Sequence, residues 1–327
     1  MPTTHSMPVR RSRTSPVAAK RILVYVQNKP FLGALLVKVP FLVELAGANP
    51  GARIELLSPV PDAALLKSLG LVHACTSFGN NHLRTLAHAL AHFKRYDLAI
   101  CMRPASQITT LYAHLSGKRT MGFLVPGGLP FRDTVAYDKS VYIAISYLKL
   151  LFRRESDDAL RARVVPAFSR VFGDTASPDA GTNAVCLFPG AGQPFKRWPA
   201  PGFAGLVAGL GPAYRYHVIV GPDERSLAET IRENASVPCE LHVGEDLRRI
   251  FALARAARLC IGNDCGPGHI GLMAGVPNLK LFPPGQDPAQ WFFPRAGNML
   301  IEGGRGGIGS IPVDRVLSAA RAMLEGR

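Results

Sequence analysis

The chain has 327 residues and 47% of them are hydrophobic, which is enough to build the cores of two α/β domains. The 38 basic residues outnumber the 23 acidic ones, so the formal net charge is +15 and an anionic partner is favoured. Only 8% of the residues are aromatic, and no zinc-knuckle, basic-heptad or RNA-binding aromatic signature is present. We therefore do not expect a nucleic-acid partner, and a phosphate-rich ligand or surface fits the charge better.

The N-terminal segment 1–20 is polar and basic and has no apolar region before a small-residue cleavage site. We expect a disordered tail rather than a secretion signal. The longest apolar stretch, Phe31–Ala46, is interrupted by Lys38, Pro40 and Glu44 and falls short of a bilayer span. These features predict a cytoplasmic protein, with peripheral attachment to the inner leaflet of a membrane as a further possibility.

The rest of the chain alternates between short apolar runs and helical patterns, which is typical of parallel α/β domains. Residues 21–172 are predicted to form one doubly wound domain, and residues 184–311 a second one after a linker at 173–183. The final segment, 312–327, is predicted to be a helix that packs back across the hinge. Five strands are predicted in each domain: 21–27, 52–59, 71–78, 97–102 and 119–126, then 184–190, 216–222, 239–244, 258–264 and 277–284.

The segment IGNDCGPGHIGLMAGVP, residues 261–277, runs from a predicted strand through a glycine-rich turn into a small-residue helix. The strand places Asp264 at its carboxyl end, and Gly266 and Gly268 allow a ligand to approach the N–H groups that open the helix. His269, in the first helical turn, faces the same position. This pattern predicts an anion site, because ligands of such sheets bind beyond the carboxyl ends of the strands.

A second turn of the same design lies upstream, in FPGAGQPFKRWP. Gly190 and Gly192 follow a strand, and Lys196 and Arg197 provide cationic donors just before the next helix. Two such turns facing one crevice are predicted to hold a diphosphate. Either turn alone is also compatible with a glycine that only packs a helix tightly on its strand.

Six cysteines are present, and none forms a CxxC pair. We expect reduced, structural thiols. Cys265 lies inside the predicted phosphate turn, where we assign it a backbone role and no chemistry. No metal ligands are predicted. The cysteines are Cys75, Cys101, Cys186, Cys239, Cys260 and Cys265.

These segments resemble the ADP-heptose:lipopolysaccharide heptosyltransferases of glycosyltransferase family nine. FPGAGQPFKRWP is similar to the family's P-G-(x)n-K-x-W-P segment, and GNDCGPGHIGLMAGVP to its D-T-G-x-x-H-x-A-x-x-x-G-x-P segment. Weaker similarity lies in KRILVYV and in YDLAICMRPASQITTLYAHLSGKRTMGF. The resemblance implies the GT-B fold, in which two Rossmann-like domains face a cleft.

The resemblance also implies an inverting transfer that needs no metal and no cofactor. The C-terminal domain would bind a nucleotide-diphospho-sugar, most simply ADP-heptose, and Lys196 and the helix opening at Gly266 would offset the charge of the leaving diphosphate. Five positions correspond to the family's donor pocket, with Cys265 in place of the usual Thr. Glu224 loosely matches an acidic residue that contacts the ribose, and is equally compatible with a solvated carboxylate at a helix start. The five positions are Lys196, Asp264, Cys265, Gly266 and His269.

The family's proposed general base is the Asp of an L-G-D segment, and the aligned residue here is Ala34. Loss of a general base commonly lowers the rate by about 10²- to 10⁴-fold. Asp133 and Asp138, in the loop after GKRTMGFLVPGG, are candidate replacements, with Asp138 favoured and His114 more remote. Each is also compatible with an ordinary surface or capping role.

Basic residues of the N-terminal half are candidates for binding an anionic glycolipid or glycan acceptor. Lys29 precedes the first glycine turn, and Arg103 follows a predicted strand at its carboxyl end. Lys38 fits a solvated helix face better.

Three functions remain open from the sequence. The first is heptosyl transfer to a lipopolysaccharide core or related glycan. The second is non-catalytic binding of a nucleotide-sugar by the same fold. The third, a dinucleotide-dependent oxidoreductase, is disfavoured because QNKPFLG lacks the G-x-G-x-x-G spacing.

Overall fold

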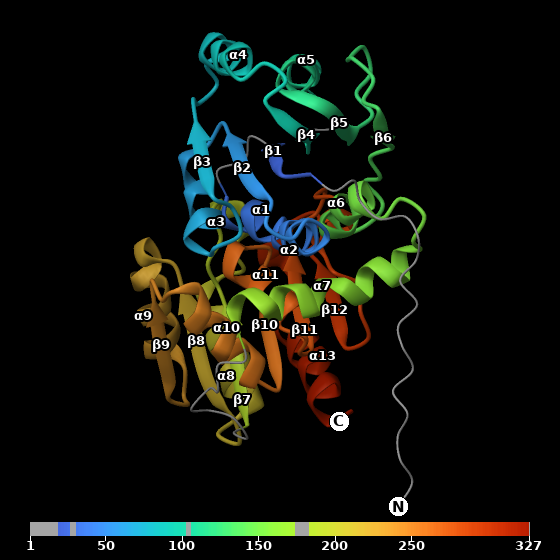
Figure 1. Cartoon of the computed structure of the whole chain (residues 1–327). Helices are drawn as coiled ribbons and strands as arrows, with labels where there is room; N and C mark the ends of the chain where they lie inside the picture. The colour runs from blue at the N-terminus through green and yellow to red at the C-terminus, as the bar shows by residue number, and fades with distance from the viewer. Residues whose placement is uncertain (1–18, 27–30, 103–105, 174–182, 327) are drawn as a thin grey trace, which may run out of the picture.

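The structure is a computed structural model that describes residues 19–26, 31–102, 106–173 and 183–326. It contains two six-stranded sheets, each with all its strands parallel, stacked one above the other along the long axis of the molecule (Figure 1). Helices cover both faces of each sheet, as the apolar runs predict. The predicted fold class, two Rossmann-like domains, is confirmed.

The N-terminal sheet has the strand order β3-β2-β1-β4-β5-β6. Its strands are β1 (Arg21–Tyr25), β2 (Arg53–Ser58), β3 (Ala74–Ser77), β4 (Tyr96–Cys101), β5 (Gly117–Phe123) and β6 (Asp133–Val135). Its helices are α1 (Leu32–Leu36), α2 (Val39–Ala48), α3 (Ala64–Ser68), α4 (His82–Ala91), α5 (Gln107–Ser116) and α6 (Ile143–Leu151).

The C-terminal sheet has the order β12-β11-β10-β7-β8-β9. Its strands are β7 (Ala184–Phe188), β8 (Arg215–Val220), β9 (Cys239–Val243), β10 (Leu259–Asn263), β11 (Asn278–Phe282) and β12 (Asn298–Glu302). Its helices are α8 (Ala200–Leu210), α9 (Arg225–Asn234), α10 (Leu247–Ala256), α11 (Gly266–Met273), α12 (Pro288–Trp291) and α13 (Val313–Glu325).

The strand order of the C-terminal sheet reverses between β7 and β10, which are neighbours in the sheet but not in sequence. Such a switch point leaves a crevice beyond the carboxyl ends of the two strands, where ligands of doubly wound sheets bind. Both predicted glycine-rich turns follow these two strands directly. The topology therefore brings the two turns to one crevice.

Helix α7 (Asp157–Phe172) links the two halves of the molecule. Its N-terminus is capped by Ser156, whose hydroxyl accepts a hydrogen bond from the N–H of Ala159. Phe168 and Phe172 pack at a tilt against Phe251 of α10, with their ring centroids 5.7 and 5.5 Å from that of Phe251. On its other side α7 packs against α2, so one continuous apolar core joins elements of both domains.

Helix α13 lies elsewhere than predicted. It packs on α8 of its own domain, where a Cβ on Gly209 would lie 2.5 Å from Leu317. Its apolar stripe of Val316, Ala320 and Leu324 is buried in the C-terminal core. The prediction that the last helix crosses the hinge is therefore wrong, because its apolar face is fully used by α8 and the sheet, and α7 makes the crossing instead.

Among the described residues, no helix combines the length and apolarity that a bilayer span requires. The six cysteines are all unpaired with one another, as expected, and five of them are buried.

Candidate functional site

The two domains touch where α1 meets α11. A Cβ on Gly33 would lie 2.6 Å from the ring of His269, and a Cβ on Gly266 would lie 2.7 Å from Leu32. Both positions therefore need glycine for the two helices to approach this closely. A cavity of about 280 Å³ opens beside this contact.

The cavity has walls from both domains. Phe31, Gly33 and Ala34 line it from the N-terminal half. The C-terminal wall combines both glycine-rich turns with α12 and the segment before it, and consists of Gly192, Gln193, Lys196, Asp264, Cys265, Gly266, His269, Gln286 and Trp291. The structure thus brings together Lys196, Asp264, Cys265, Gly266 and His269, the five residues that the resemblance marks as donor-pocket positions.

Asp264 carries the central charge of the cavity. One of its oxygens accepts a hydrogen bond from Lys196 Nζ at 2.7 Å, and the other lies 3.7 Å from His269 Nε2. Burial by itself raises the pKa of Asp264, but the interactions with His269, Lys280 and Lys196, including the hydrogen bond from Lys196, outweigh it, so the pKa is lowered. Asp264 is therefore an ionised carboxylate that holds Lys196 at the cavity wall.

His269 is fully buried and has a fixed orientation. Its Nδ1 lies 3.4 Å from the hydroxyl of Tyr142, which immediately precedes α6, and Trp291 packs edge-on against its ring. Burial, together with the charge of Lys280, lowers the pKa of His269 to about 3. The imidazole is therefore neutral at pH 7, and with Tyr142 donating to Nδ1 it presents Nε2–H toward Asp264. This state suits a hydrogen-bond donor and does not suit a general base.

The lowered pKa of His269 predicts a pH-dependent stability. The pKa of His269 is about 3 in the folded state and 6.5 in the unfolded state. At pH values between these two, the unfolded chain therefore binds up to one more proton at this residue than the folded chain does. The contribution of His269 to the free energy of unfolding is therefore fully present above pH 6.5 and is lost as the pH falls toward 3. We expect His269→Gln to reduce the slope of unfolding free energy against pH, by at most about 1.4 kcal/mol per pH unit, in urea titrations from pH 4.5 to 6.5. An unchanged slope in the variant would contradict the buried, neutral state of His269.

The N-terminus of α11 is capped by Cys265. Its backbone is extended, and its sulfur accepts a hydrogen bond from the N–H of Gly268 at 3.3 Å. The thiol thus takes the capping role of a hydroxyl, and burial raises its pKa. Gly268 itself serves packing, because a Cβ there would lie 2.2 Å from Lys280 Nζ. The prediction that Gly268 lets a ligand approach is corrected on this point: its N–H is used by Cys265, and it does not line the cavity.

Lys280 is a buried cation in β11, beneath the start of α11. Its Nζ donates to the carbonyl of Asn263 at 2.8 Å, and burial lowers its pKa. The Asn263 side chain accepts from the N–H of Trp198 at 3.1 Å and donates to the carbonyl of Pro189 at 2.7 Å. Asn263 therefore fixes the two glycine-rich turns to each other.

Glu224 lies behind the cavity rather than in it. One carboxylate oxygen accepts from the N–H of Ala191 at 3.0 Å and from Arg197 at 3.1 Å, and the other accepts from the N–H of Gly221 at 3.0 Å. Arg197 also donates to the carbonyl of Ala191. A Cβ on Gly190 would lie 2.0 Å from the carboxylate, so this glycine leaves room for Glu224.

The donor-binding predictions for Gly190, Arg197 and Glu224 are therefore not supported by geometry. None of the three lines the cavity, and the carboxylate oxygens of Glu224 already accept hydrogen bonds within the protein. Together they clamp the loop after β7 to the loop after β8, which positions Gly192 and Lys196 from behind.

The structure argues against both candidate bases. Asp133 is 4% exposed and is held by Arg119 and Arg153; burial raises its pKa, but the two guanidinium groups outweigh this and lower it. The pKa of Asp138 is lowered by hydrogen bonds from Ser140 and by the charge of Lys149. Neither lines the cavity, and a lowered pKa makes a carboxylate a weaker base.

His114 is equally remote from the cavity. Its two ring nitrogens lie 2.8 and 3.1 Å from the carbonyl oxygens of Thr110 and Pro130, and its ring stacks on Phe131. This arrangement fixes the loop after β5 against α5, which is a structural role.

The remaining predicted residues are Ala34, Lys38, Lys29 and Arg103. Ala34 is buried and lines the cavity, as its alignment with the base position implies. Lys38 is only 1% exposed, and its amino group donates to the carbonyl of Ala34, so the expected solvated face is wrong. Lys29 and Arg103 lie outside the described residues, as do positions 1–18 of the predicted tail and 174–182 of the predicted linker.

Several residues of the site were missed from the sequence: Phe31, Gln193, Gln286 and Trp291, which line the cavity, and Tyr142 and Lys280, which support His269 and the start of α11. Tyr142 and Trp291 lie outside both glycine-rich turns, and nothing in their local pattern indicates contact with His269. Lys280 carried a usable signal, since a lone Lys within the apolar run NLKLF is costly to bury without a partner.

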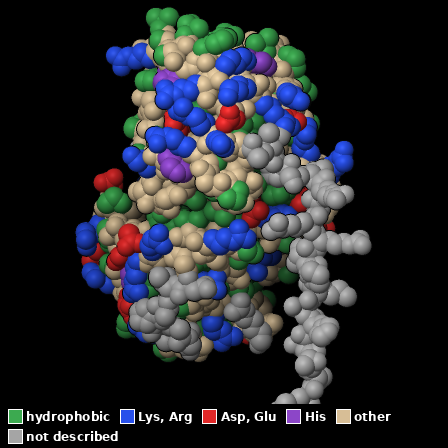
Figure 2. Space-filling view, viewed as in Figure 1, with side chains coloured by type: hydrophobic (Ala, Val, Ile, Leu, Met, Phe, Trp, Pro, Cys, Tyr) green, Lys and Arg blue, Asp and Glu red, His purple; other side chains and the backbone are tan. Residues whose placement is uncertain are grey.

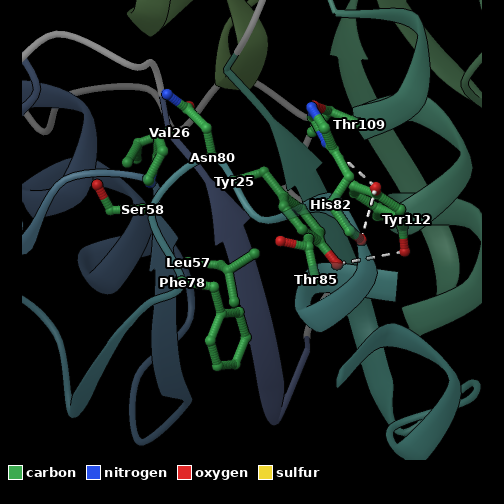
Figure 3. Close-up of a pocket in the computed structure, with 12 residues that line it drawn as sticks. Tyr25, Val26, Leu57, Ser58, Phe78, Asn80, His82, Thr85, Thr109 and Tyr112 are labelled. Carbon is green, nitrogen blue, oxygen red and sulfur yellow. Dashed lines mark hydrogen bonds between the residues drawn. The ribbon is translucent and has the colours of Figure 1, made fainter. Parts of the chain in front are cut away.

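A second, smaller cavity lies in the N-terminal domain, at the carboxyl ends of β1 and β2 (Figure 3). Tyr25 points across it to Ser116 and to the carbonyl of Tyr112, at 3.0 and 3.3 Å, and Tyr112 reaches the carbonyl of His82. Its volume of about 30 Å³ is enough for a water molecule and far too small for a sugar.

A protein-family model described as glycosyltransferase family 9 (heptosyltransferase) matches residues 147–292. The resemblance to glycosyltransferase family 9 is confirmed. The matched family 9 segment contains every residue of the C-terminal cavity wall, from Gly192 to Trp291, whereas Phe31, Gly33 and Ala34 lie outside it. The C-terminal wall of the cavity thus carries the family's pattern.

Similar solved structures cover almost the whole chain. A family 9 glycosyltransferase from Veillonella parvula has 21% identity and a TM-score of 0.68, over 94% of this chain and 98% of that one. E. coli ADP-heptose LPS heptosyltransferase II has 20% identity and a TM-score of 0.64, over 94% and 99%. E. coli heptosyltransferase WaaC with ADP-2-deoxy-2-fluoro heptose has 17% identity and a TM-score of 0.68, over 92% and 99%.

At these identities the structures establish a shared fold, the two-domain α/β architecture of these glycosyltransferases. A search of curated proteins finds no match.

Proposed function

We propose that the protein is an inverting glycosyltransferase that binds a nucleotide-diphospho-sugar in the cavity between its domains. ADP-heptose is the proposed donor, and a lipopolysaccharide core or related anionic glycan is the proposed acceptor. The observation that carries the proposal is the joint position of Lys196, Asp264 and the start of α11 on one cavity wall. The family match and the similarity to a heptosyltransferase crystallised with an ADP-heptose analogue support it.

The proposed leaving group is a nucleoside diphosphate, whose charge must be offset as the sugar departs. Lys196 is 18% exposed and lines the cavity, and the positive end of α11 faces the same space. A cation and a helix N-terminus both stabilise developing phosphate charge most strongly in a partly desolvated site. We propose that they perform this role and that transfer needs no bound metal and no cofactor.

The N-terminal wall of the cavity favours a second candidate function, which is non-catalytic binding of the same nucleotide-sugar. Among the described residues, the N-terminal wall consists of Phe31, Gly33 and Ala34, none of which can take a proton. Segments 27–30 and 103–105, which the structure does not describe, contain no Asp, Glu or His in their sequences. A transferase of this chain therefore needs a base supplied by the acceptor itself or brought in when the acceptor binds.

Calorimetric titration with ADP-heptose, ADP and UDP, followed by transfer and hydrolysis assays on the donor that binds, tests the proposal. Binding of ADP-heptose with turnover supports the transferase. Binding without turnover on any acceptor supports the binder. No binding of any nucleotide would reject both.

We further propose that the N-terminal domain contacts an anionic membrane surface. Helices α4 and α5 and the loop after β5 lie together at the top of the molecule, where apolar side chains are exposed near basic ones (Figure 2). Leu83 and Phe93 are 80% and 61% exposed, and Arg84, Lys94 and Arg95 lie beside them in sequence. Exposed apolar groups with a basic border suit an anionic lipid interface.

The membrane proposal predicts that Leu83→Asp/Phe93→Asp lowers binding to vesicles containing phosphatidylglycerol by about tenfold or more, since each apolar side chain contributes roughly 1.5–3 kcal/mol when buried. Met299→Asp in β12, which is also an exposed apolar position, is the matched control and should bind like the original chain. Co-sedimentation with phosphatidylglycerol and with neutral phosphatidylcholine vesicles measures both. Equal binding of the double variant and the control would contradict the proposal.

A further inference from the structure

Three potential metal ligands meet at the edge of the C-terminal sheet, away from the cavity. They are His217 in β8 and Glu240 and His242 in β9, and one ligand atom from each lies within 4.8 Å of those of the other two. His217 Nδ1 lies 3.0 Å from His242 Nε2 and 3.7 Å from Glu240 Oε2. None of the three lines the cavity between the domains.

The strand register explains why these side chains meet. In the parallel pair β8–β9, His217 aligns with Glu240, and Ile219 aligns with His242. Aligned residues of neighbouring strands point to the same face, and so do residues two apart on one strand. The cluster is therefore built by the backbone of two regular strands rather than by mobile loops.

We infer that His217, His242 and Glu240 form a binding site for a divalent transition-metal ion, with Zn²⁺ the best fit. Two imidazoles and one carboxylate are a ligand set that zinc accepts, with a fourth position left for water. Bonds of about 2.0–2.1 Å in tetrahedral geometry put neighbouring ligand atoms about 3.3 Å apart. The separations of 3.0 and 3.7 Å fall on either side of this value.

The surroundings prepare the ligands for a metal. Arg215 holds one oxygen of Glu240 at 2.6 Å, while the other oxygen faces His217. The second nitrogen of His242, Nδ1, lies 3.8 Å from Glu245, in the position of a carboxylate that orients a metal-binding imidazole.

One of the three ligands, Glu240, is exposed to solvent, and an ion bound here would have a structural consequence. Strand β9 is the edge of its sheet, and Glu240 is about half exposed. A bound ion would tie this edge strand to β8, which leads directly to Gly221 and the Glu224 clamp behind the cavity. The metal is thus a structural clip of the C-terminal domain, separate from the proposed transfer.

Zinc binding to the full-length protein, freed of any polyhistidine tag and stripped with EDTA, tests the inference. We expect isothermal titration with ZnCl₂ to show one equivalent bound, Co²⁺ to show the visible absorption of a tetrahedral site, and ZnCl₂ to raise the melting temperature. Glu240→Gln keeps both imidazoles and should weaken zinc binding by about tenfold or more.

The matched control is His92→Ala. His88 in α4 and His92 directly after it form another close histidine pair, with ring centroids 4.2 Å apart, so this change removes one of two neighbouring imidazoles elsewhere and should leave zinc binding unchanged. Two outcomes would overturn the inference: no zinc bound by the stripped protein, or equal zinc affinity in Glu240→Gln and the original chain. The first would mean that the two imidazoles simply share a hydrogen bond.

Discussion

Replacing Ala34 with Asp is expected to raise the turnover of sugar transfer, by roughly 10²- to 10⁴-fold if the missing base is what limits the reaction. Ala34 lies on α1 and lines the cavity opposite the wall formed by Lys196 and Asp264. It is only 3% exposed, and burial raises the pKa of a carboxylate toward the range where it accepts protons well at neutral pH. An Asp placed there gains a basic oxygen facing the proposed acceptor.

Ala34→Asn is the control for this gain, because it has the shape of Asp without a titratable group. Single-turnover rates of both variants, with affinity for the donor measured in parallel, separate chemistry from binding. If turnover rises in Ala34→Asp and not in Ala34→Asn, the result supports a base position that is empty in the original chain. Turnover that is unchanged or lower in Ala34→Asp, with the donor still bound, would show that the base lies elsewhere.

Removing the amino group of Lys196 is expected to weaken binding of the nucleotide-sugar by roughly 10- to 100-fold, corresponding to about 1.5–3 kcal/mol for a hydrogen bond between charged groups. Lys196 lines the cavity and donates to Asp264 at 2.7 Å. In Lys196→Ala the diphosphate loses a cation, and the ionised Asp264 beside it repels the ligand without compensation. Calorimetric titration with ADP measures the loss.

Loss of the Lys196–Asp264 pair also threatens stability, since Asp264 is 6% exposed and would be left without its closest cation. The double variant Lys196→Ala/Asp264→Asn removes that buried charge and should melt closer to the original chain while still binding ADP weakly. Lys118→Ala breaks an exposed pair with Asp97 and should change neither property. Undiminished ADP affinity in Lys196→Ala would reject the donor site.

Much of the fold could be predicted from the sequence because its signals are local. Apolar runs such as the one in β10 are buried on both faces, and each is followed by a turn with Gly or Pro. Two of the four edge strands, β6 and β12, were not predicted. Both strands lie at a sheet edge, where they are covered on fewer sides. Strand β6 has only the three residues DTV, and β12 is only partly buried, so neither sequence shows the continuous apolar run of a central strand.

Most of the C-terminal wall of the cavity could also be predicted, because it lies within two short segments. Lys196 and the residues from Asp264 to His269 are close in sequence to the strand ends that position them. The sequence says less about residues whose partners are distant: Arg197 and Glu224 were candidates for contacting the ligand, and the structure shows them bound to each other, with Arg197 also donating to Ala191. Charge and position near a turn do not reveal whether another part of the chain already satisfies a side chain.

The sequence by itself determined that this protein is a two-domain α/β protein with a glycine-rich turn after each of two strands and no Asp at position 34. Periodicity, glycine and proline act within a few residues, so they can be recognised without coordinates. Only the tertiary structure decided that α1 meets α11 through Gly33 and Gly266, that Tyr142 contacts His269, and that two histidines and a glutamate meet between β8 and β9. Those contacts depend on strand order, register and helix crossing, which join residues that no local pattern connects.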